Sequence, residues 1–127
     1  MLFRSALERL GDAEQDRGDV AAAVETYTEA IGLNPDNAEV HHNLGSAYAR
    51  LSRWADAIRQ YEETLRINPG SARAVKNLAR AHNARGIELA DARKFAEAVT
   101  EFSEAVRLDP DFVDAAANLA RAKAMIK

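Results

Sequence analysis

The sequence predicts an all-α protein made of tandem helix pairs, and three observations support this prediction. Alanine, leucine, glutamate and arginine, all strong helix formers, dominate the 127 residues, whereas aromatic residues make up only 6%. Prolines follow Asn or Asp at spaced intervals, at Pro35, Pro69 and Pro110. Other residue patterns recur in phase with these prolines, which indicates an internal repeat. The length fits a single domain over residues 1–127.

The repeat has a fixed order of landmark residues. Pro69 follows Pro35 by 34 positions (69 − 35), and Pro110 follows Pro69 by 41 (110 − 69). Each unit contains a Leu followed by a small residue, and later an Ala followed four positions on by an aromatic residue. These landmarks are Leu10-Gly11, Leu44-Gly45 and Leu78-Ala79, then Ala23-x3-Tyr27, Ala57-x3-Tyr61 and Ala98-x3-Phe102. We interpret the small residues, Ala79 included, as points where helices approach closely, and the aromatic residues as packing between repeats.

Two breaks in each repeat divide it into two helices. Asn-Pro or Asp-Pro ends the second helix, because proline lacks the N–H donor and restricts the residue before it. Gly18, Ser52 and Arg93 lie at the other break. The predicted fold is a right-handed α-solenoid of seven helices, with repeats at about 4–37, 38–71 and 72–110 and a capping helix at 111–126. The predicted helices are 4–17, 20–33, 37–51, 54–67, 71–91, 95–108 and 111–126.

The third repeat is seven residues longer than the second. Seven residues are close to two helical turns, so this insertion keeps the same face of the helix toward its neighbours. We therefore expect one first helix over 71–91, lengthened by about 10 Å. The competing interpretation is a break at Gly86 followed by a separate short helix.

Composition excludes several classes of function. The net charge of −3, from 20 acidic and 17 basic residues, argues against nucleic acid or an anionic membrane as the main partner. The absence of cysteine excludes disulfides and thiolate metal sites. The first residues lack a secretory signal, and no apolar stretch approaches the roughly 18 residues that span a bilayer. We therefore expect a cytoplasmic protein.

The second repeat carries a specific family resemblance. It reads His41-x2-Leu44-Gly45-x2-Tyr48…Ala57-x3-Tyr61…Pro69. This resembles the tetratricopeptide repeat (TPR) family, whose unit of about 34 residues has Trp-x2-Leu-Gly-x2-Tyr…Ala-x3-Phe…Pro. It departs at His41 and Tyr61, and the first repeat has Glu14 where the pattern has Tyr. The resemblance covers nearly the whole chain and implies stacked helix pairs whose first helices line a concave groove that binds a peptide or a partner protein.

The candidate groove residues are the polar side chains on the faces of the first helices that point away from the core. Three asparagines share the position just before the landmark Leu or its equivalent, and the resemblance implies that their amides hold the backbone of an extended ligand. The alternative is that they only solvate the face. The predicted binding residues are Glu8, Asp12, Glu39, His42, Asn43, Arg73, Lys76, Asn77, Arg80 and Asn118.

The charges of this set separate by repeat. The groove is acidic in the first repeat, at Glu8, Asp12 and Asp16. A basic stripe lies in the third repeat, at Arg73, Lys76 and Arg80. We therefore expect a ligand whose acidic groups face the third repeat. Family members that bind the carboxyl-terminal tails of heat-shock chaperones have Lys and Asn where this chain has Glu8 and Asp12. Because these carboxylates would repel a terminal carboxylate, we expect the chain not to bind such a tail.

The sequence offers no catalytic or metal site. His41 and His82 fall on the predicted packing face, and Glu39-x-x-His42 lacks the second such pair that a di-metal site requires. Neither a glycine-rich phosphate loop nor a nucleophile elbow is present. We therefore predict a protein-interaction scaffold that has no enzyme activity and no cofactor. The alternatives are a self-assembly module that forms homo-oligomers and an accessory module of a larger complex.

Overall fold

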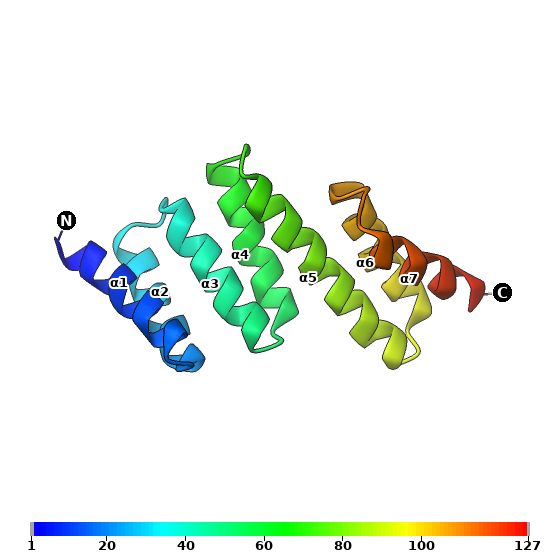
Figure 1. The fold of residues 1–127 in the computed structure, drawn as a ribbon, viewed down its shortest axis with the longest axis horizontal. Coiled ribbons are helices and arrows are strands. Elements are labelled where there is room, and N and C mark those ends of the chain that lie inside the picture. The colour runs from blue at the N-terminus through cyan, green and yellow to red at the C-terminus, as the bar shows by residue number, and fades with distance from the viewer. Residues whose placement is uncertain (1, 127) are drawn as a thin grey trace. The chain divides into compact units, whose positions relative to one another are not determined.

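The computed structural model describes residues 2–126 of the chain, and the side chains of residues 6–126. Residues 2–126 form seven α-helices and no strand (Figure 1). The all-α prediction is confirmed, and each predicted helix boundary lies within two residues of the observed one. The helices are α1 (Leu2–Asp16), α2 (Val20–Leu33), α3 (Ala38–Arg50), α4 (Trp54–Ile67), α5 (Ala72–Asp91), α6 (Phe95–Leu108) and α7 (Val113–Ala124).

The chain divides into two compact units. Unit 1 is Met1–Ala74, with helices α1 to α4 and the first residues of α5. Unit 2 is Val75–Lys127, with the rest of α5 and helices α6 and α7. In unit 1, consecutive helices pack against one another from α1 to α4, and in unit 2 helix α6 packs against α7.

Aliphatic and alanine side chains surround a tyrosine in the core of unit 1. Tyr27 is completely buried among Leu7, Val20 and Val40, with alanines of α2 and α3 that allow the helices to approach closely. Leu44 of α3 packs into this cluster and is only 2% exposed, whereas its repeat equivalent Leu10 is 45% exposed. Leu10 is therefore not a core residue, although it is the landmark equivalent to Leu44 in the first repeat. Leu44 packs on the helix pair that precedes it, and the described chain has no helix pair before α1.

A glycine on each first helix lies against an aromatic ring of the following helix. A Cβ atom on Gly11 would lie 2.5 Å from Tyr27, and one on Gly45 would lie 2.7 Å from Tyr61. In unit 2 the corresponding distance is 2.5 Å, from Gly86 to Phe102. The residue in the third contact is thus Gly86, which corrects the expectation that Ala79 takes this role. In all three contacts, only a residue without a side chain leaves room for the ring.

Helix α5 explains why Ala79 was assigned to that contact. It is one helix through Gly86, with 20 residues compared with 13 in α3. Its first turn lies beside α3 at the shorter of the two proline spacings, 34 residues, since Arg73 pairs with Glu39 (73 − 39). Its later turns follow the longer spacing of 41 residues. His82 binds Glu101 at 2.8 Å as His41 binds Gln60 at 2.7 Å, and both partners are 41 positions apart (82 − 41 and 101 − 60). The seven additional residues therefore lie inside the helix, ahead of His82, and Ala79 precedes the contact with Phe102.

The second helix of each repeat ends as the prolines predict. The last helical bonds are donated by the residues just before proline, from Asn34 N to Ala30 O at 3.0 Å and from Asn68 N to Thr64 O at 2.8 Å. The next helices then begin at side-chain caps. Asn37 accepts a hydrogen bond from Val40 N at 3.2 Å, and Ser71 accepts one from the backbone N–H three residues later at the same distance.

The turns within the helix pairs share a left-handed residue. Gly18, Ser52 and Arg93 have φ values of 85°, 57° and 63°. The N–H group of each following residue closes the turn on a carbonyl five residues back, at distances between 2.8 and 2.9 Å. This is the usual helix ending with a left-handed residue, where glycine avoids the contact between Cβ and the backbone. Only the first turn has glycine, so the other two hold a strained residue.

We expect an added methyl group to destabilise the protein at the glycine–ring contacts. Gly45→Ala and Gly86→Ala should each lower the free energy of unfolding by about 1–3 kcal/mol, since the buried rings leave no room. Gly32→Ala is the matched control, because a Cβ atom on this helical glycine would meet nothing within 4 Å. It should raise stability by roughly 0.5–1 kcal/mol through helix propensity. Urea unfolding monitored by circular dichroism would measure all three, and a Gly86→Ala protein as stable as Gly32→Ala would contradict the assignment.

The left-handed turns predict the opposite response to glycine. Ser52→Gly should raise stability by roughly 0.5–1 kcal/mol, because glycine accepts the positive φ without strain. Arg93→Gly should give a smaller gain, since the Arg93 guanidinium lies 5.6 Å from the centre of the Phe95 ring and that attraction would be lost. Gly18→Ala should lower stability by roughly 0.5–1 kcal/mol, because alanine is strained at this positive φ. Equal unfolding midpoints for the native and Ser52→Gly proteins would show that the turn is not strained.

Candidate functional site

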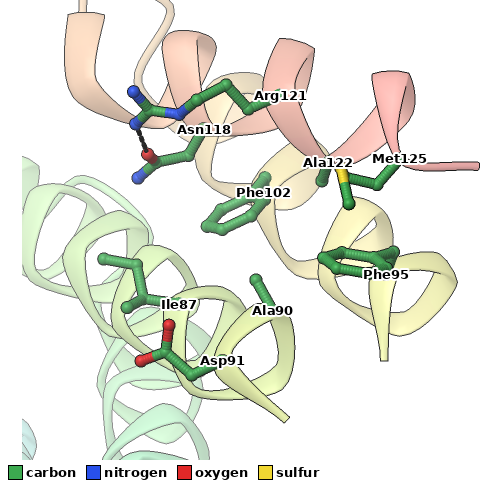
Figure 2. Close-up of a pocket in the computed structure, with 9 residues that line it drawn as sticks. All are labelled: Ile87, Ala90, Asp91, Phe95, Phe102, Asn118, Arg121, Ala122 and Met125. Carbon is green, nitrogen blue, oxygen red and sulfur yellow. Dashed lines mark hydrogen bonds between the residues drawn. The ribbon is translucent and has the colours of Figure 1, made fainter. Parts of the chain in front are cut away.

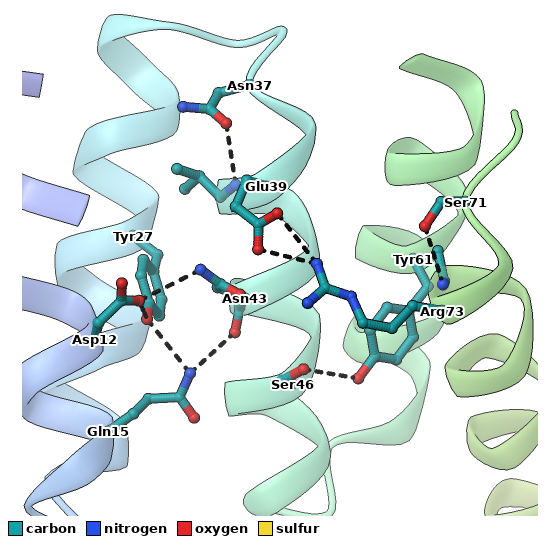
Figure 3. Close-up of polar contacts among 12 residues, drawn as sticks. Asp12, Gln15, Tyr27, Asn37, Glu39, Asn43, Ser46, Tyr61, Ser71 and Arg73 are labelled. Carbon is teal, nitrogen blue, oxygen red and sulfur yellow. Dashed lines mark hydrogen bonds and ion pairs between the residues drawn. The ribbon is translucent and has the colours of Figure 1, made fainter. Parts of the chain in front are cut away.

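Helices α1 and α3 of unit 1 border an open polar cavity of about 430 Å³, which we call the unit-1 cavity. Its walls come from the two first helices, and the buried ring of Tyr27 from α2 forms part of the lining (Figure 3). Of the predicted site residues, Asp12, Glu39 and Asn43 line this cavity. Asp16, which the sequence places at the acidic end of the groove, lines it as well, whereas Gln15, Tyr27 and Arg50 were not among the residues predicted for the groove.

A network of hydrogen bonds connects the cavity walls. The Tyr27 hydroxyl donates to the Asp12 carboxylate, and the Asn43 amide donates to the same oxygen at 3.3 Å. The Gln15 amide donates to the backbone carbonyl of Asn43 at 3.3 Å. Arg50 donates to the backbone and side-chain oxygens of Gln15 at 2.8 and 3.1 Å. The network fixes side chains of α1 and α3 toward one space, so the cavity is preorganised for hydrogen bonding.

The cavity contains more negative than positive charge. Asp12, Asp16 and Glu39 contribute carboxylates, and Arg50 is the one basic residue in the lining. Burial and the hydrogen bond to Asp12 raise the pKa of Tyr27 above its ordinary value. The phenol therefore stays neutral and acts as a donor at physiological pH. Such a lining favours neutral or positively charged groups of a ligand.

Glu39 and Arg73 form an ion pair at the edge of unit 1. Both Glu39 oxygens accept hydrogen bonds from Arg73, at 3.1 and 3.0 Å (Figure 3). Their side chains are 57% and 60% exposed. Exposed pairs of this kind stabilise proteins by about 0–1 kcal/mol. A ligand carboxylate can therefore replace Glu39 at little cost, but Arg73 already has a partner in this structure.

His42 does not lie where the sequence analysis expected it. We predicted that it faces the groove, yet it is only 5% exposed, and its ring centre lies 5.5 Å from that of Tyr61. Burial, and then the positive charge of Arg73, lower the pKa of His42. Its imidazole is therefore neutral at physiological pH. The helical pattern alone missed this burial because the Tyr61 ring extends over that side of α3.

Glu8, the remaining predicted site residue of unit 1, lies on α1. It is half-buried and accepts a hydrogen bond from the Asn37 amide at 2.7 Å. It is not among the residues that line the unit-1 cavity. Its interaction connects α1 to the residue that caps α3, so it has a structural partner besides any role in binding.

The remaining predicted residues belong to unit 2. Lys76 and Arg80 are both exposed, and Arg80 donates to the Asn77 side chain at 3.4 Å. Arg80 also lines a cavity of about 270 Å³ together with three aspartates, Asp109, Asp111 and Asp114. The Asn118 amide donates to Asn83 at 3.0 Å and accepts from Arg121. The basic stripe predicted from the sequence is thus partly compensated by neighbouring acids and amides.

The described side chains show no metal site. Residues 6–126 contain no group of three or more His, Asp or Glu residues placed to bind a metal ion. No helix within the described part of the chain has both the length and the hydropathy to cross a membrane. What the unit-1 cavity offers chemically is directional hydrogen bonding and charge, from side chains held by the network around Asp12.

Curated proteins with similar sequence match short parts of the chain. The human Small glutamine-rich tetratricopeptide repeat-containing protein beta is 39% identical over 67 residues, which cover 46% of this chain and 22% of that protein. The Arabidopsis thaliana Hsp70-Hsp90 organizing protein 3 is 40% identical over 48 residues, covering 38% of this chain and 9% of that protein. The chain therefore spans less than a quarter of the length of these relatives.

Solved structures with the same fold cover nearly the whole chain. The first TPR of Spaghetti (RPAP3) bound to HSP90 peptide SRMEEVD has a TM-score of 0.65 and 22% identity, covering 95% of this chain and 90% of that chain. The Arabidopsis OM64 TPR domain has a TM-score of 0.64 and 24% identity, covering 99% and 98%. At these identities the likeness establishes the helical repeat fold.

Family profiles describe the repeats directly. A profile of the family described as Tetratricopeptide repeat matches residues 8–72 and 42–87, and a second profile with that description matches residues 79–112. The match to the second profile begins at Ala79, inside α5, and includes the Gly86–Phe102 contact. Because these matches cover well over half of the residues, the chain belongs to the tetratricopeptide repeat family.

Proposed function

We propose that this chain is a protein-interaction module that binds a peptide or a segment of a partner protein on the polar faces of its first helices. The unit-1 cavity carries the proposal, because charged and amide side chains of α1 and α3 converge there on one space. The Spaghetti TPR structure, which contains an HSP90 peptide, gives independent support from the same fold. Selection from a random dodecapeptide display library on the native chain tests the proposal, and failure to enrich any peptide would reject it.

The chemistry of the unit-1 cavity suits reversible binding. Asn43 and Gln15 each present an amide, which can donate to a peptide carbonyl and accept from a peptide N–H. Asn43 is half-buried, and its hydrogen bond to Asp12 is long, at 3.3 Å, so exchange for a ligand group costs little. The three carboxylates of the lining favour a ligand residue that is neutral or positively charged.

The acidic part of the ligand is proposed to interact with α5. Arg73 pairs with Glu39, and Arg80 lies beside three aspartates. Lys76 is exposed and makes no hydrogen bond or ion pair with the side chains described in residues 6–126. Of the three basic residues predicted to face acidic ligand groups, Lys76 is therefore the one with an uncompensated charge.

We expect charge reversal on α5 to weaken ligand binding in a graded way. Lys76→Glu should reduce the affinity of a selected acidic peptide by about threefold to tenfold, and Arg73→Glu or Arg80→Glu by less. The loss should shrink at high salt, because the contacts are open to solvent and the Debye length is only about 8 Å at physiological ionic strength. Calorimetric titration at two salt concentrations measures both effects. Unchanged affinity in a folded triple variant would exclude α5 from the binding surface.

A second prediction concerns the tail peptide seen with the Spaghetti domain. The native chain should bind SRMEEVD weakly, because Glu8 and Asp12 repel its carboxyl terminus. Glu8→Lys combined with Asp12→Asn should raise the affinity by at least about tenfold, or about 1.4 kcal/mol. The introduced Asn keeps an acceptor for the Tyr27 hydroxyl.

Glu29→Lys serves as a control for this gain, because it makes the same Glu-to-Lys exchange at an exposed position of α2. It should leave the affinity for SRMEEVD nearly unchanged. Fluorescence anisotropy with the labelled peptide would compare the three proteins. Native binding as tight as that of the double variant would refute the repulsion argument.

A further inference from the structure

Besides the small cavity next to Arg80, unit 2 contains a cavity of about 340 Å³ that is bordered by α5, α6 and α7 (Figure 2). We call it the unit-2 cavity. Phe102, which packs against Gly86, lies at its base, and the side chains of Ile87 and Met125 face it from α5 and from the end of α7. Ile87 and Met125 are 41% and 50% exposed, so two large apolar side chains border an open space.

The unit-1 cavity and the unit-2 cavity occupy the same place in their repeats. Six residues that line the unit-1 cavity have counterparts 75 positions later in the chain (87 − 12). All six counterparts line the unit-2 cavity. The same offset relates Gly11 and Tyr27 to Gly86 and Phe102. The counterparts of residues 12, 15, 16, 27, 43 and 50 are Ile87, Ala90, Asp91, Phe102, Asn118 and Met125.

The chemistry of the lining differs at four of these six positions. Asp, Gln, Tyr and Arg in unit 1 become Ile, Ala, Phe and Met in unit 2, so every one of the four loses its polar group. The Asp and the Asn are kept, as Asp91 and Asn118. Unit 2 therefore keeps an amide and a carboxylate at the border of the space but presents an apolar interior where unit 1 has a hydrogen-bonding one.

The border of the unit-2 cavity carries one charge of each sign, from Asp91 and Arg121. Asp91 is exposed, and its carboxylate makes no hydrogen bond or ion pair with the side chains described in residues 6–126. The Arg121 guanidinium keeps its positive charge but is held by its hydrogen bond to Asn118, and Arg93 lies over the Phe95 ring, so Asp91 is the charged group of the border that has no partner among the described side chains. A basic group beside the cavity would therefore complement Asp91.

We infer that the unit-2 cavity binds one aliphatic or aromatic side chain of an extended partner peptide, with a basic residue next to it in the peptide. This rests on the proposed function and adds the chemistry of one ligand position. The Asn118 amide donates one hydrogen to Asn83 and keeps a second for a peptide carbonyl. The volume lies at the lower end of the about 300–1,000 Å³ typical of ligand pockets, which suits a side chain rather than a whole helix.

The test compares matched variants with peptides enriched from a random dodecapeptide library on the native chain. The variant Ile87→Asp with Met125→Arg gives the unit-2 cavity the side chains that unit 1 has at these positions. It should weaken an enriched peptide by at least about tenfold, because apolar contact area is lost. Asp91→Asn should weaken it about twofold to fivefold at low salt and little at high salt. Val113→Asp is the control, since this side chain is 76% exposed and lies outside the cavity.

The outcomes are separable. Enriched peptides that pair an apolar with a basic residue, and that lose affinity in the double variant but not in Val113→Asp, support the inference. Peptides that bind the double variant as tightly as the native chain overturn it while leaving peptide binding intact. Failure to enrich any peptide overturns the proposed function and the inference with it. A native dimer that the double variant dissociates would assign the cavity to a second copy of the chain and overturn the peptide occupant.

Circular dichroism and unfolding midpoints of each variant establish that a loss of affinity is not a loss of fold. The substituted side chains are exposed at both positions, so the helices should remain intact. Methyl resonances of Ile87 and Met125 in the native chain should shift on addition of an enriched peptide. Methyl groups that do not respond to a bound peptide would overturn the assignment of the cavity.

Discussion

The contact between a glycine on a first helix and an aromatic ring on the second helix determines how the rest of each repeat is placed. The ring lies so close to the glycine that a Cβ atom there would be 2.5 to 2.7 Å from it, so the two helices approach closely at this point. The same ring also reaches the candidate site. Tyr27 packs against Gly11 and donates to Asp12, so one side chain supports the fold and orients a cavity residue.

The sequence was sufficient for the helices but not for every packing partner. Proline and the left-handed turn residues are local signals, and they located the helix ends within two residues. Continuing the spacing of the first two repeats beyond Gly45 assigned the third contact to Ala79, because this spacing assumes that the insertion lies after that residue. Gly86 was visible in the sequence, and its separation from Phe102 equals that of Gly45 from Tyr61, which would have identified the contact.

The candidate site was harder to derive, because it depends on contacts across helices. A helical pattern placed Asp12, Glu39 and Asn43 on the polar faces, and these residues do line a cavity. The pattern could not show that a tyrosine ring covers His42 or that Glu39 engages Arg73. Arg50 was detectable, since it lies two turns from Asn43 on the same side of α3. Partners from other helices are a property of packing that a single helix pattern does not contain.

Helix α5 also has a consequence for how sequences of this kind change in length. Its start and its end satisfy two different spacings, and an insertion of seven residues reconciles them because it rotates the helix by only about 20°. An insertion of five would turn the later residues by roughly 140°, which would carry Gly86 away from Phe102 and put polar side chains in its place. Insertions and deletions of residues in such first helices should therefore have lengths close to a whole number of helical turns. The lengths of repeats in related proteins should differ from one another by such numbers.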